Sequence, residues 1–178
     1  MLVSIVTVFH NRAEFVNESI QSLLNQTHEE IEIIAIDDGS EDHTYQELKK
    51  IKDHRLKVYT HKNQGFVKSI CKAINLAEGS IIAVHGSGDV SYKSRIKNQL
   101  KVLKENLDVG VVGCYVKNTD LVKKSENIHK PIIDNKNGVT NQLFKKNFLT
   151  HGEVMFRRSI YDGVGGYREV FKYAQDYD

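Results

Sequence analysis

Hydrophobic and polar residues follow one another along the chain in two alternating patterns. Segments dominated by apolar and β-branched residues predict buried strands at residues 2–9, 31–36, 56–60, 81–84 and 109–116. Between them, apolar residues at helical spacing predict helices at residues 14–25, 44–51, 63–79 and 94–107. This alternation indicates an α/β fold with a mostly parallel central sheet and helices on both faces.

Three short polar loops follow predicted strands. They read "FHNR" after the first strand, "DDGS" after the second and "HGSGD" after the fourth. In a parallel sheet the carboxyl ends of the strands meet at one edge, and ligands bind there. Topology alone therefore predicts that the three loops lie together and form a ligand site.

The second half of the chain is less regular. Residues 118–137 are polar and rich in lysine and hold the single proline, Pro131, so we expect a surface excursion there. The segment "EVMFRRSIYDGVGGY" predicts a short strand, a basic turn and a glycine-rich loop. No internal repeat divides the chain, and its length suits one domain over residues 1–178.

Composition and charge narrow the classes of protein. Hydrophobic residues make up 40% of the 178 and charged residues 27%, which is typical of a soluble globular domain. The net charge of +2 is too small to indicate a nucleic-acid partner. Cys71 and Cys114 lie far apart without metal-ligand spacing, which indicates free thiols in a reducing compartment.

We find neither a membrane-spanning segment nor a signal peptide in the amino-acid sequence. No stretch reaches the ~18 apolar residues of a membrane span. The opening "MLVSIVTVFHNR" has no basic leader and no cleavage site, so we interpret it as a first strand and not as a signal peptide. We expect a cytoplasmic protein whose membrane contact, if it has any, is peripheral.

The "DDGS" loop places Asp37 and Asp38 at a strand end before a glycine turn. Adjacent residues of an extended segment point in opposite directions, so one carboxylate can face a ligand while the other braces the loop. A turn with an N-cap for the next helix explains the same residues without a ligand. The loop by itself leaves both interpretations open.

The "HGSGD" loop supplies glycine N–H groups, the Ser87 hydroxyl and the Asp89 carboxylate. Glycines let a backbone approach a phosphate, and one carboxylate can hold Mg²⁺ or Mn²⁺ on that phosphate. The alternative is a strand-to-helix turn with Asp89 near the cap of the next helix. Whether a single aspartate holds a metal, or whether a metal site has been dismantled, stays open at this point.

Two later segments carry further candidates. "HGEVMFRRS" offers His151, Glu153 and Arg157 as contacts for a donor or an acceptor, although a solvated turn has the same composition. The chain ends in "QDYD", where Asp176 and Asp178 are two residues apart. An acidic terminus is by itself a weak signal.

Taken in order, four blocks resemble family 2 glycosyltransferases of the GT-A fold. The first is "VSIVTVFHNRAEFVNESIQSLLNQTHEEIEIIAIDDGSEDHT" and the second is "NQGFVKSICKAINLAEGSIIAVHGSGD". The third is "HGEVMFRRSIYDGVGGYRE", and "QDYD" resembles the acidic motif that carries the catalytic base. The resemblance covers essentially the whole chain.

The resemblance implies a role for each matching residue. Asp38 would read the nucleotide base and Asp37 would brace its loop, with Ser87 also on the nucleotide. Asp89 falls in the metal-binding loop, and Asp176 matches the base that deprotonates the acceptor hydroxyl. Three residues of the first block would lie along the nucleotide: Thr7, Phe9 and Asn11.

The chain departs from the family pattern in three places. The family loop usually reads D-x-D-D, whereas these positions hold Gly86, Ser87, Gly88 and Asp89, so the usual metal ligand aligns with Gly88. Gln175 replaces the common Glu of the base motif. Family members continue after this motif, so we expect the domain to be truncated at its C-terminal end.

The resemblance implies an inverting transferase that uses a nucleotide-sugar, with a UDP-sugar as the expected donor and Mg²⁺ or Mn²⁺ as the expected cofactor. The expected acceptor is a saccharide or lipid-linked saccharide of a bacterial surface polysaccharide, reached at the inner face of the cytoplasmic membrane. One alternative is a catalytically impaired nucleotide-sugar-binding module or scaffold. A nucleotidyltransferase is disfavoured, because "FHNRAEF" has none of the glycines of a phosphate loop.

Overall fold

The central feature of the computed structural model is one six-stranded sheet. The structure describes residues 1–120, 123–130, 138–143 and 145–171. Neighbouring strands in the order β3–β2–β1–β4 run parallel, and β8 runs antiparallel to both its neighbours. The expected α/β fold with a mostly parallel sheet is confirmed. In spatial order the strands are β3 (Leu56–His61), β2 (Ile31–Asp38), β1 (Val3–Phe9), β4 (Ile81–Val84), β8 (Met155–Arg157) and β5 (Val111–Val112).

The middle strands consist mostly of apolar residues because both faces of the sheet are covered. Every residue of β1, β2 and β4 is buried, as expected for parallel strands between two helical layers. The helices are η1 (Ala13–Phe15), α1 (Val16–Leu24), α2 (Thr44–Lys50), α3 (Phe66–Leu76), α4 (Arg95–Glu105), α5 (Gly138–Leu143), η2 (His151–Glu153) and α6 (Arg158–Gly163). Among the described residues, no helix combines the length and apolarity that crossing a membrane requires.

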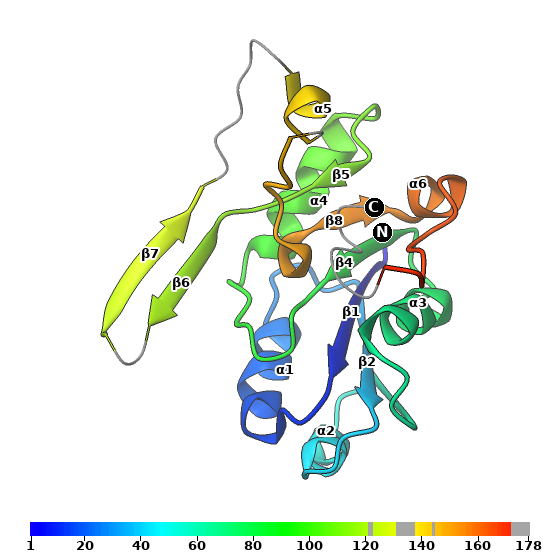
Figure 1. Ribbon diagram of the computed structural model, residues 1–178, viewed down its shortest axis with the longest axis vertical. Coiled ribbons are helices and arrows are strands. Elements are labelled where there is room, and N and C mark those ends of the chain that lie inside the picture. The colour runs from blue at the N-terminus through cyan, green and yellow to red at the C-terminus, as the bar shows by residue number, and fades with distance from the viewer. Residues whose placement is uncertain (121–122, 131–137, 144, 172–178) are drawn as a thin grey trace.

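Two hydrophobic clusters hold the helices on the sheet. One cluster joins α1, α2 and α4 to one face through side chains such as Ile20, Leu48 and Leu100. The other joins α3 to the opposite face through Ile70 and Ile74. Figure 1 shows the same division, with α1 and α4 on one side of the strands and α3 and α6 on the other.

The second half of the chain differs from the strand expected at residues 109–116. There β5 covers only two residues, and the chain leaves the sheet after it, where an added Cβ at Gly113 would lie 2.9 Å from a methyl carbon of Leu149. A separate hairpin follows, made of β6 (Val116–Asp120) and β7 (Ser125–His129). The surface excursion expected at residues 118–137 thus includes paired strands, while residues 121–122 and 131–137 lie outside the described residues.

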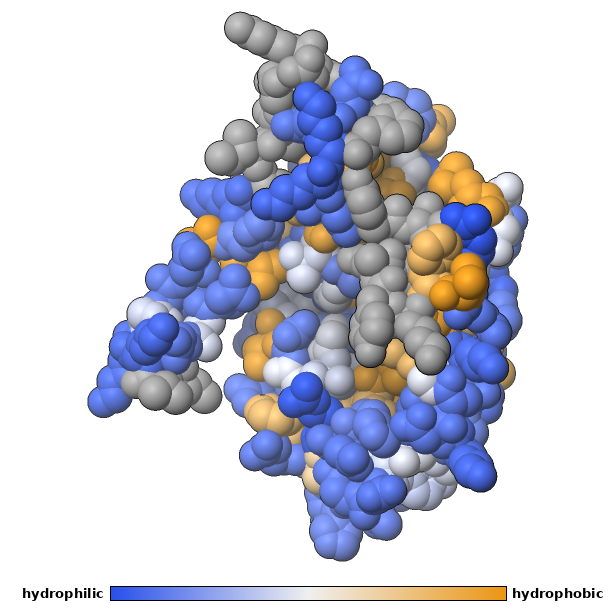
Figure 2. All heavy atoms as spheres, in the orientation of Figure 1, coloured by the Kyte–Doolittle hydropathy of each residue, from blue (hydrophilic) through white to orange (hydrophobic). Residues whose placement is uncertain are grey.

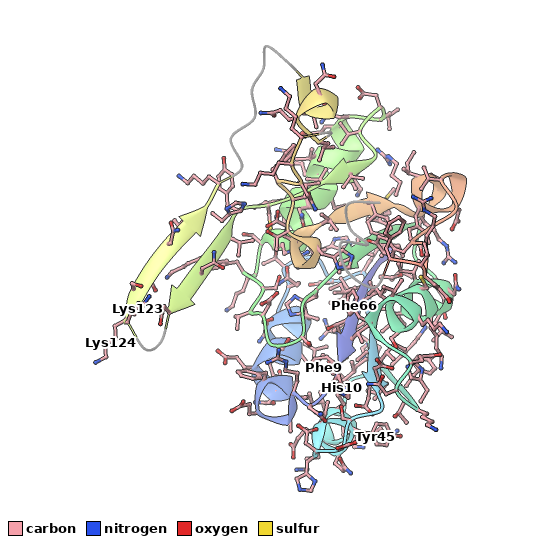
Figure 3. All side chains as sticks on the ribbon, viewed as in Figure 1. Phe9, His10, Tyr45, Phe66, Lys123 and Lys124 are labelled. Atoms are coloured by element: carbon pink, nitrogen blue, oxygen red, sulfur yellow. The ribbon has the colours of Figure 1, made fainter. Side chains whose placement is uncertain are left out.

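This hairpin projects from the body of the protein. Figure 2 shows it as a largely hydrophilic arm, and Lys123 and Lys124 lie at its tip in Figure 3. Both strands are mostly exposed, because their polar side chains need no cover. A cross-strand pair between Lys117 Nζ and Glu126 Oε1, 2.6 Å apart, joins them.

Strand register brings the polar loops to one edge of the sheet. Phe9 pairs with Asp37, and Asp38 pairs with His61, so β1, β2 and β3 end at the same level. The last residue of β4, Val84, pairs with Val6 of the same parallel set. The predicted gathering of "FHNR", "DDGS" and "HGSGD" at the carboxyl edge is confirmed.

Candidate functional site at the carboxyl edge

Asp37 braces the loop at the end of β2. The carboxylate is buried, and its Oδ2 accepts a hydrogen bond from the Thr60 hydroxyl of β3 at 2.7 Å. Its Oδ1 accepts one from the backbone N–H of Ser40 at 3.3 Å. These two bonds hold the turn after β2 against the neighbouring strand.

Asp38 is also buried, in a cradle made by the turn before α3. Its Oδ1 accepts a hydrogen bond from the N–H of Gln64 at 3.0 Å, and its Oδ2 accepts one from the N–H of Gly65 at 3.1 Å. Gly65 has a φ of 93°, which glycine adopts without steric cost. The sequence predicted a glycine turn here. The structure shows that the N–H groups of this turn bind the Asp38 carboxylate.

A chain of hydrogen bonds reaches Asp38 from the far side. Lys72 Nζ donates to His61 Nδ1 at 3.0 Å, which leaves His61 Nε2 to donate to Asp38 Oδ1 at 3.0 Å. Burial raises the pKa of Asp38, but hydrogen bonds from Gln64, Ser69 and His61 outweigh it and hold the pKa below its ordinary value. Asp38 is therefore a fixed anion, and His61 and Lys72 are partners that no sequence motif indicated.

The loop after β1 forms the rim of this site. Asn11 has a φ of 51°; its N–H donates to Ser40 Oγ at 3.0 Å, and its Oδ1 accepts from the N–H of Glu41 at 2.8 Å. His10 Nδ1 lies 3.0 Å from the carbonyl oxygen of Asp38 and, in Figure 3, stands where β1 ends. Both rim residues are exposed, so they are open to a ligand.

Thr7 and Phe9 do not reach this surface. Both side chains are fully buried, and Phe9 packs in the hydrophobic cluster with Val16 and Ile20. Thr7 Oγ1 has no hydrogen-bond partner among the described residues. Any contact that these two residues make with a nucleotide at this edge would come from their backbone.

The loop after β4 is folded around its glycines. Gly88 has a φ of 100°, which L side chains rarely adopt, and an added Cβ would lie 3.3 Å from the Phe15 ring. An added Cβ at Gly86 would collide with the Asp89 carboxylate. An aspartate at position 88 would be strained in this backbone conformation. The usual acid of the family loop therefore could not replace Gly88 without a cost in backbone strain.

Asp89 presents its carboxylate beside these glycines. The residue is exposed overall, and neither carboxylate oxygen accepts a hydrogen bond from a described residue. The carboxyl does lie against Gly86 and close to Gly152, and this partial burial raises the pKa of Asp89 while the charge of Arg95 lowers it. Ser87, between the two glycines, is half-buried.

His85 fastens the glycine loop to α1. Its ring is buried, with Nε2 lying 3.0 Å from Ser19 Oγ and 3.1 Å from the carbonyl oxygen of Asp89. A carbonyl can only accept, so Nε2 carries the proton and Nδ1 is left without a partner among the described residues. Burial, together with the nearby Arg95, lowers the pKa of His85 to about 3, so the ring is neutral at ordinary pH.

Arg95 and Gln99 of α4 support the same loop from below. Arg95 Nη2 donates to the carbonyl oxygen of Val84 at 2.7 Å, and its Nε donates to Gln99 Oε1 at 3.1 Å. Gln99 Nε2 donates in turn to the carbonyl oxygens of Glu153 at 2.7 Å and Val112 at 3.1 Å. Two side chains thereby connect β4, β5 and η2, a role that helical periodicity alone did not reveal.

Glu153 and His151 both belong to η2 but contact different parts of the protein. Glu153 is buried; its Oε1 accepts from the N–H of Thr150 at 2.9 Å, and burial raises its pKa despite that bond. His151 Nε2 lies 2.8 Å from the Tyr167 hydroxyl, and its ring packs edge-on against Phe66 with centroids 5.5 Å apart. Figure 3 shows Phe66 at the start of α3, so His151 joins the wall next to the Asp38 cradle.

Arg157 lies away from this site. It pairs with Ile81 at the start of β4, at the amino end of the parallel strands. Its Nε donates to the carbonyl oxygen of Val109 at 2.9 Å, and its Nη2 donates to those of Leu103 at 2.5 Å and Asn106 at 3.2 Å. The structure therefore gives Arg157 a role in holding the end of α4 and does not bring it to the carboxyl edge.

The described residues fit a hard cation only in part. They contain no group of three or more His, Cys, Asp or Glu side chains placed to hold a metal ion. The Asp89 carboxylate nevertheless accepts no hydrogen bond from a described residue, and Mg²⁺ and Mn²⁺ are often held by one or two carboxylates plus substrate phosphates. The predicted catalytic residue Asp176 lies outside the described residues.

These features define a class: an α/β protein with a ligand site at the carboxyl edge of a mostly parallel sheet. A family model described as glycosyl transferase family 2 matches residues 4–165. The chain belongs to this family, and its sheet is that of the GT-A fold, as the resemblance implied.

Relatives and solved structures agree with this assignment. The chain is 28% identical over 200 residues to an uncharacterized glycosyltransferase of Haemophilus influenzae, covering 99% of this chain and 58% of that protein. It is 29% identical over 183 residues to the O-antigen biosynthesis glycosyltransferase WbnJ of Escherichia coli, covering 99% of this chain and 69% of the relative.

Two solved structures show the same fold. Residues 1–349 of Staphylococcus aureus TarS in complex with UDP align with a TM-score of 0.74 and 22% identity, covering 99% of this chain and 53% of that chain. The mannosyltransferase PcManGT of Pyrobaculum calidifontis, in complex with GDP-Man and Mn²⁺, aligns with a TM-score of 0.70 and 16% identity, covering 93% and 47%. The chain thus spans about half the length of these two solved chains.

Proposed function

We propose that this chain is the nucleotide-sugar-binding part of an inverting glycosyltransferase that moves a sugar from a UDP-sugar to a saccharide hydroxyl. Membership of family 2 supports transfer, and a TarS structure that holds UDP-GlcNAc supports the donor class. The carboxyl edge supplies what such a donor needs. Asp38 is an acceptor for a base N–H, while the N–H groups of the glycine loop suit a diphosphate.

A divalent cation completes this proposed site. Asp89 would hold it, and the bound ion would stabilise the negative charge of the nucleoside diphosphate as it leaves. His85 and Arg95 keep the Asp89 loop in place, so this carboxylate needs little rearrangement before the donor binds. The rim residues Asn11 and His10 are exposed beside the base.

The proposed reaction is a single displacement at C1 of the donor sugar. Asp176 removes the proton from the acceptor hydroxyl as its oxygen attacks C1. The bond from C1 to the diphosphate oxygen breaks, and the electron pair leaves with the nucleoside diphosphate. Attack opposite the leaving group inverts the anomeric centre, and positioning supplies much of the acceleration because the leaving group is already good.

The acceptor is proposed to be a saccharide or lipid-linked saccharide of a bacterial surface polysaccharide. WbnJ, which this chain resembles, is named for O-antigen biosynthesis. A lipid-linked acceptor would place the enzyme at the inner face of the cytoplasmic membrane, in peripheral contact with it. His151, beside the donor edge, is a candidate contact for the sugar that is transferred.

The Asp89 carboxylate, which accepts no hydrogen bond from a described residue and lies on the same edge as the Asp38 cradle, carries this proposal. Calorimetry with UDP, GDP, CMP and dTDP, first with Mn²⁺ and then with EDTA, tests it. We expect UDP to bind with Mn²⁺ and to lose most of its affinity in EDTA and in Asp89→Ala. Asp108→Ala is the matched control, because Asp108 is an exposed aspartate in the turn after α4.

The outcomes separate three situations. Binding of UDP that ignores both EDTA and Asp89→Ala would mean that the glycine loop alone holds the diphosphate. Binding of another nucleotide in preference to UDP would replace the donor. Failure to bind any of the four nucleotides would contradict the proposed function.

A second candidate is a module that binds a nucleotide-sugar without turnover. It is favoured by Gly88, because its φ of 100° is a conformation that disfavours the second acid that the family loop usually has. Hydrolysis of the bound donor by water distinguishes the two candidates. A catalyst should release UDP slowly from UDP-GlcNAc and lose that activity in Asp176→Asn while keeping its affinity for UDP; a binding module should release none.

A further inference from the structure

A cavity of ≈ 480 Å³ lies behind the Asp89 loop, on the side that faces α4 and the root of the hairpin. Its wall includes Asp89 from the glycine loop, Asn98 from α4, Tyr115 before β6 and Glu153 from η2. This volume is within the range of small-molecule sites in proteins. Asp89 thus belongs both to the proposed donor edge and to this second space.

Buried polar atoms in and beside this cavity lack partners. Glu153 is only 3% exposed, yet its Oε2 has no hydrogen-bond partner among the described residues. Ser91 is 7% exposed, and its Oγ is in the same situation. Leaving buried polar groups unsatisfied costs free energy, so a polar ligand or water must complete them.

Two tyrosines line the same space from its outer side. Tyr92 is 67% exposed and Tyr115 is 66% exposed, which is unusual for large side chains with aromatic rings. A tyrosine ring offers an apolar face of the kind that the C–H face of a sugar ring can stack on, and its hydroxyl stays free to bond. The cavity therefore combines exposed aromatic rings with unsatisfied polar atoms deeper inside.

The charges of the wall select between ligand classes. The carboxylates of Asp89 and Glu153 and the cations of Arg95 and Lys117 balance one another, so the wall offers no net charge to an ion such as phosphate. A purely apolar ligand would leave Glu153 Oε2 and Ser91 Oγ without partners. A neutral molecule with many hydroxyls can donate to the carboxylates, accept from Lys117 and Asn98, and stack on the tyrosines.

We propose that this cavity binds one neutral pyranose ring of the acceptor, next to the carboxylate that serves the donor. The proposal rests on the glycosyl transfer proposed above and adds a location and a ligand chemistry for the acceptor. Asp89 then marks the boundary where the two substrates meet, and the hairpin root that carries Lys117 forms the outer wall of the acceptor site.

The two cysteines provide an internal test. Cys114 lines the cavity, whereas Cys71 lies on α3, with Sγ 3.6 Å from the Tyr161 hydroxyl. Both cysteines are alkylated with N-ethylmaleimide in the presence of the methyl glycosides of glucose, galactose, mannose or N-acetylglucosamine. Peptide mass spectrometry measures the rate of alkylation at each cysteine. At ten times its dissociation constant, a bound glycoside should slow alkylation of Cys114 by about tenfold and leave Cys71 unchanged.

Variants of the wall decide whether the protection comes from this cavity. Tyr115→Ala and Glu153→Gln should each weaken the protection of Cys114, whereas Tyr45→Ala on α2 should not. Tyr115 is exposed, so its variant remains informative even if Glu153→Gln fails to fold. Protection of Cys114 by none of the four glycosides, equal protection of both cysteines, or protection that Tyr115→Ala leaves intact would overturn the proposal.

Calorimetry with UDP on the same protein keeps the two proposals apart. UDP binding without protection of Cys114 leaves the donor site standing and removes the cavity from the acceptor site. Protection of Cys114 without binding of any nucleotide would keep a sugar site but overturn its assignment to an acceptor.

Discussion

Asp38, at the end of β2, and Asp89, in the loop after β4, lie on either side of β1 at the same sheet edge but have opposite surroundings. Asp38 is buried, accepts hydrogen bonds from two backbone N–H groups and from His61, and has a lowered pKa. Asp89 is exposed, accepts none from the described residues through its carboxylate, and has a raised pKa. The negative charge of Asp38 is already stabilised by hydrogen bonds within the protein, whereas that of Asp89 has no such donors among the described residues.

Residue type and position at the sheet edge therefore do not by themselves assign a role to an aspartate. A carboxylate surrounded by donors stabilises the fold and offers a fixed acceptor to a ligand. A carboxylate beside glycines, which accepts no hydrogen bond from a described residue, can bind a cation when a phosphate brings one.

The largest expected effect is on stability when Asp38 is removed. Asp38→Ala leaves three donors without their acceptor, and we expect a loss of about 3 kcal/mol in the free energy of unfolding. Asp89→Ala should change it by less than about 0.5 kcal/mol, as for other exposed positions. Urea unfolding of both variants, with Asp108→Ala as the control, measures the difference; equal losses for Asp38 and Asp89 would contradict the contrast.

A pH effect should follow from His85, which holds the Asp89 loop. The pKa of about 3 in the folded protein lies below the ordinary histidine value of 6.5, so the unfolded chain takes up the proton first as the pH falls. The contribution to stability is complete above pH 6.5 and is lost as the pH falls toward 3, at about 1.4 kcal/mol per pH unit. Between pH 6.5 and 5.5 the wild-type protein should lose about 1 kcal/mol of this stability in urea unfolding, and His85→Gln should not lose it.

His54→Gln provides the control for that measurement, because the His54 side chain is 92% exposed. The same pH slope in wild type and in His85→Gln would show that another group is responsible.

A smaller effect is expected when the acid typical of the family loop is put back. Gly88→Asp forces a side chain into a backbone with a φ of 100°, close to Phe15, at a cost of about 1–2 kcal/mol. We expect no gain in Mn²⁺-dependent UDP affinity. Gly163→Asp is the control, since an added Cβ there meets no atom within 4 Å; tighter Mn²⁺ binding by Gly88→Asp would show that the loop can still form the usual site.

The smallest effect concerns Arg157, which the sequence placed among the ligand contacts. Arg157→Gln removes bonds to backbone carbonyls at the end of α4, and we expect a loss of about 1 kcal/mol in stability. The affinity for UDP should stay that of the wild type in calorimetry. A clear loss of UDP affinity without a loss of stability would return Arg157 to the site.

Much of the fold could be predicted because its strands are buried on both faces. Segments in which most residues are apolar or β-branched, such as residues 2–9 and 31–36, identify central parallel strands without any knowledge of their neighbours. The hairpin of β6 and β7 was not predicted, because its strands are polar and exposed and have no hydrophobic pattern. Pairing there depends on cross-strand contacts such as Lys117 with Glu126.

The α/β architecture and the edge where the acidic loops meet could be predicted from the amino-acid sequence, because strand polarity and local periodicity are properties of short segments. The fold was needed to show that Thr7 and Phe9 point into the core, that Arg157 lies at the opposite edge, and that His61 and His85 support the acidic loops. These roles depend on which atoms packing brings within hydrogen-bond distance. Residues far apart in the chain, such as Ser19 and His85, meet only after the sheet and its helices have assembled.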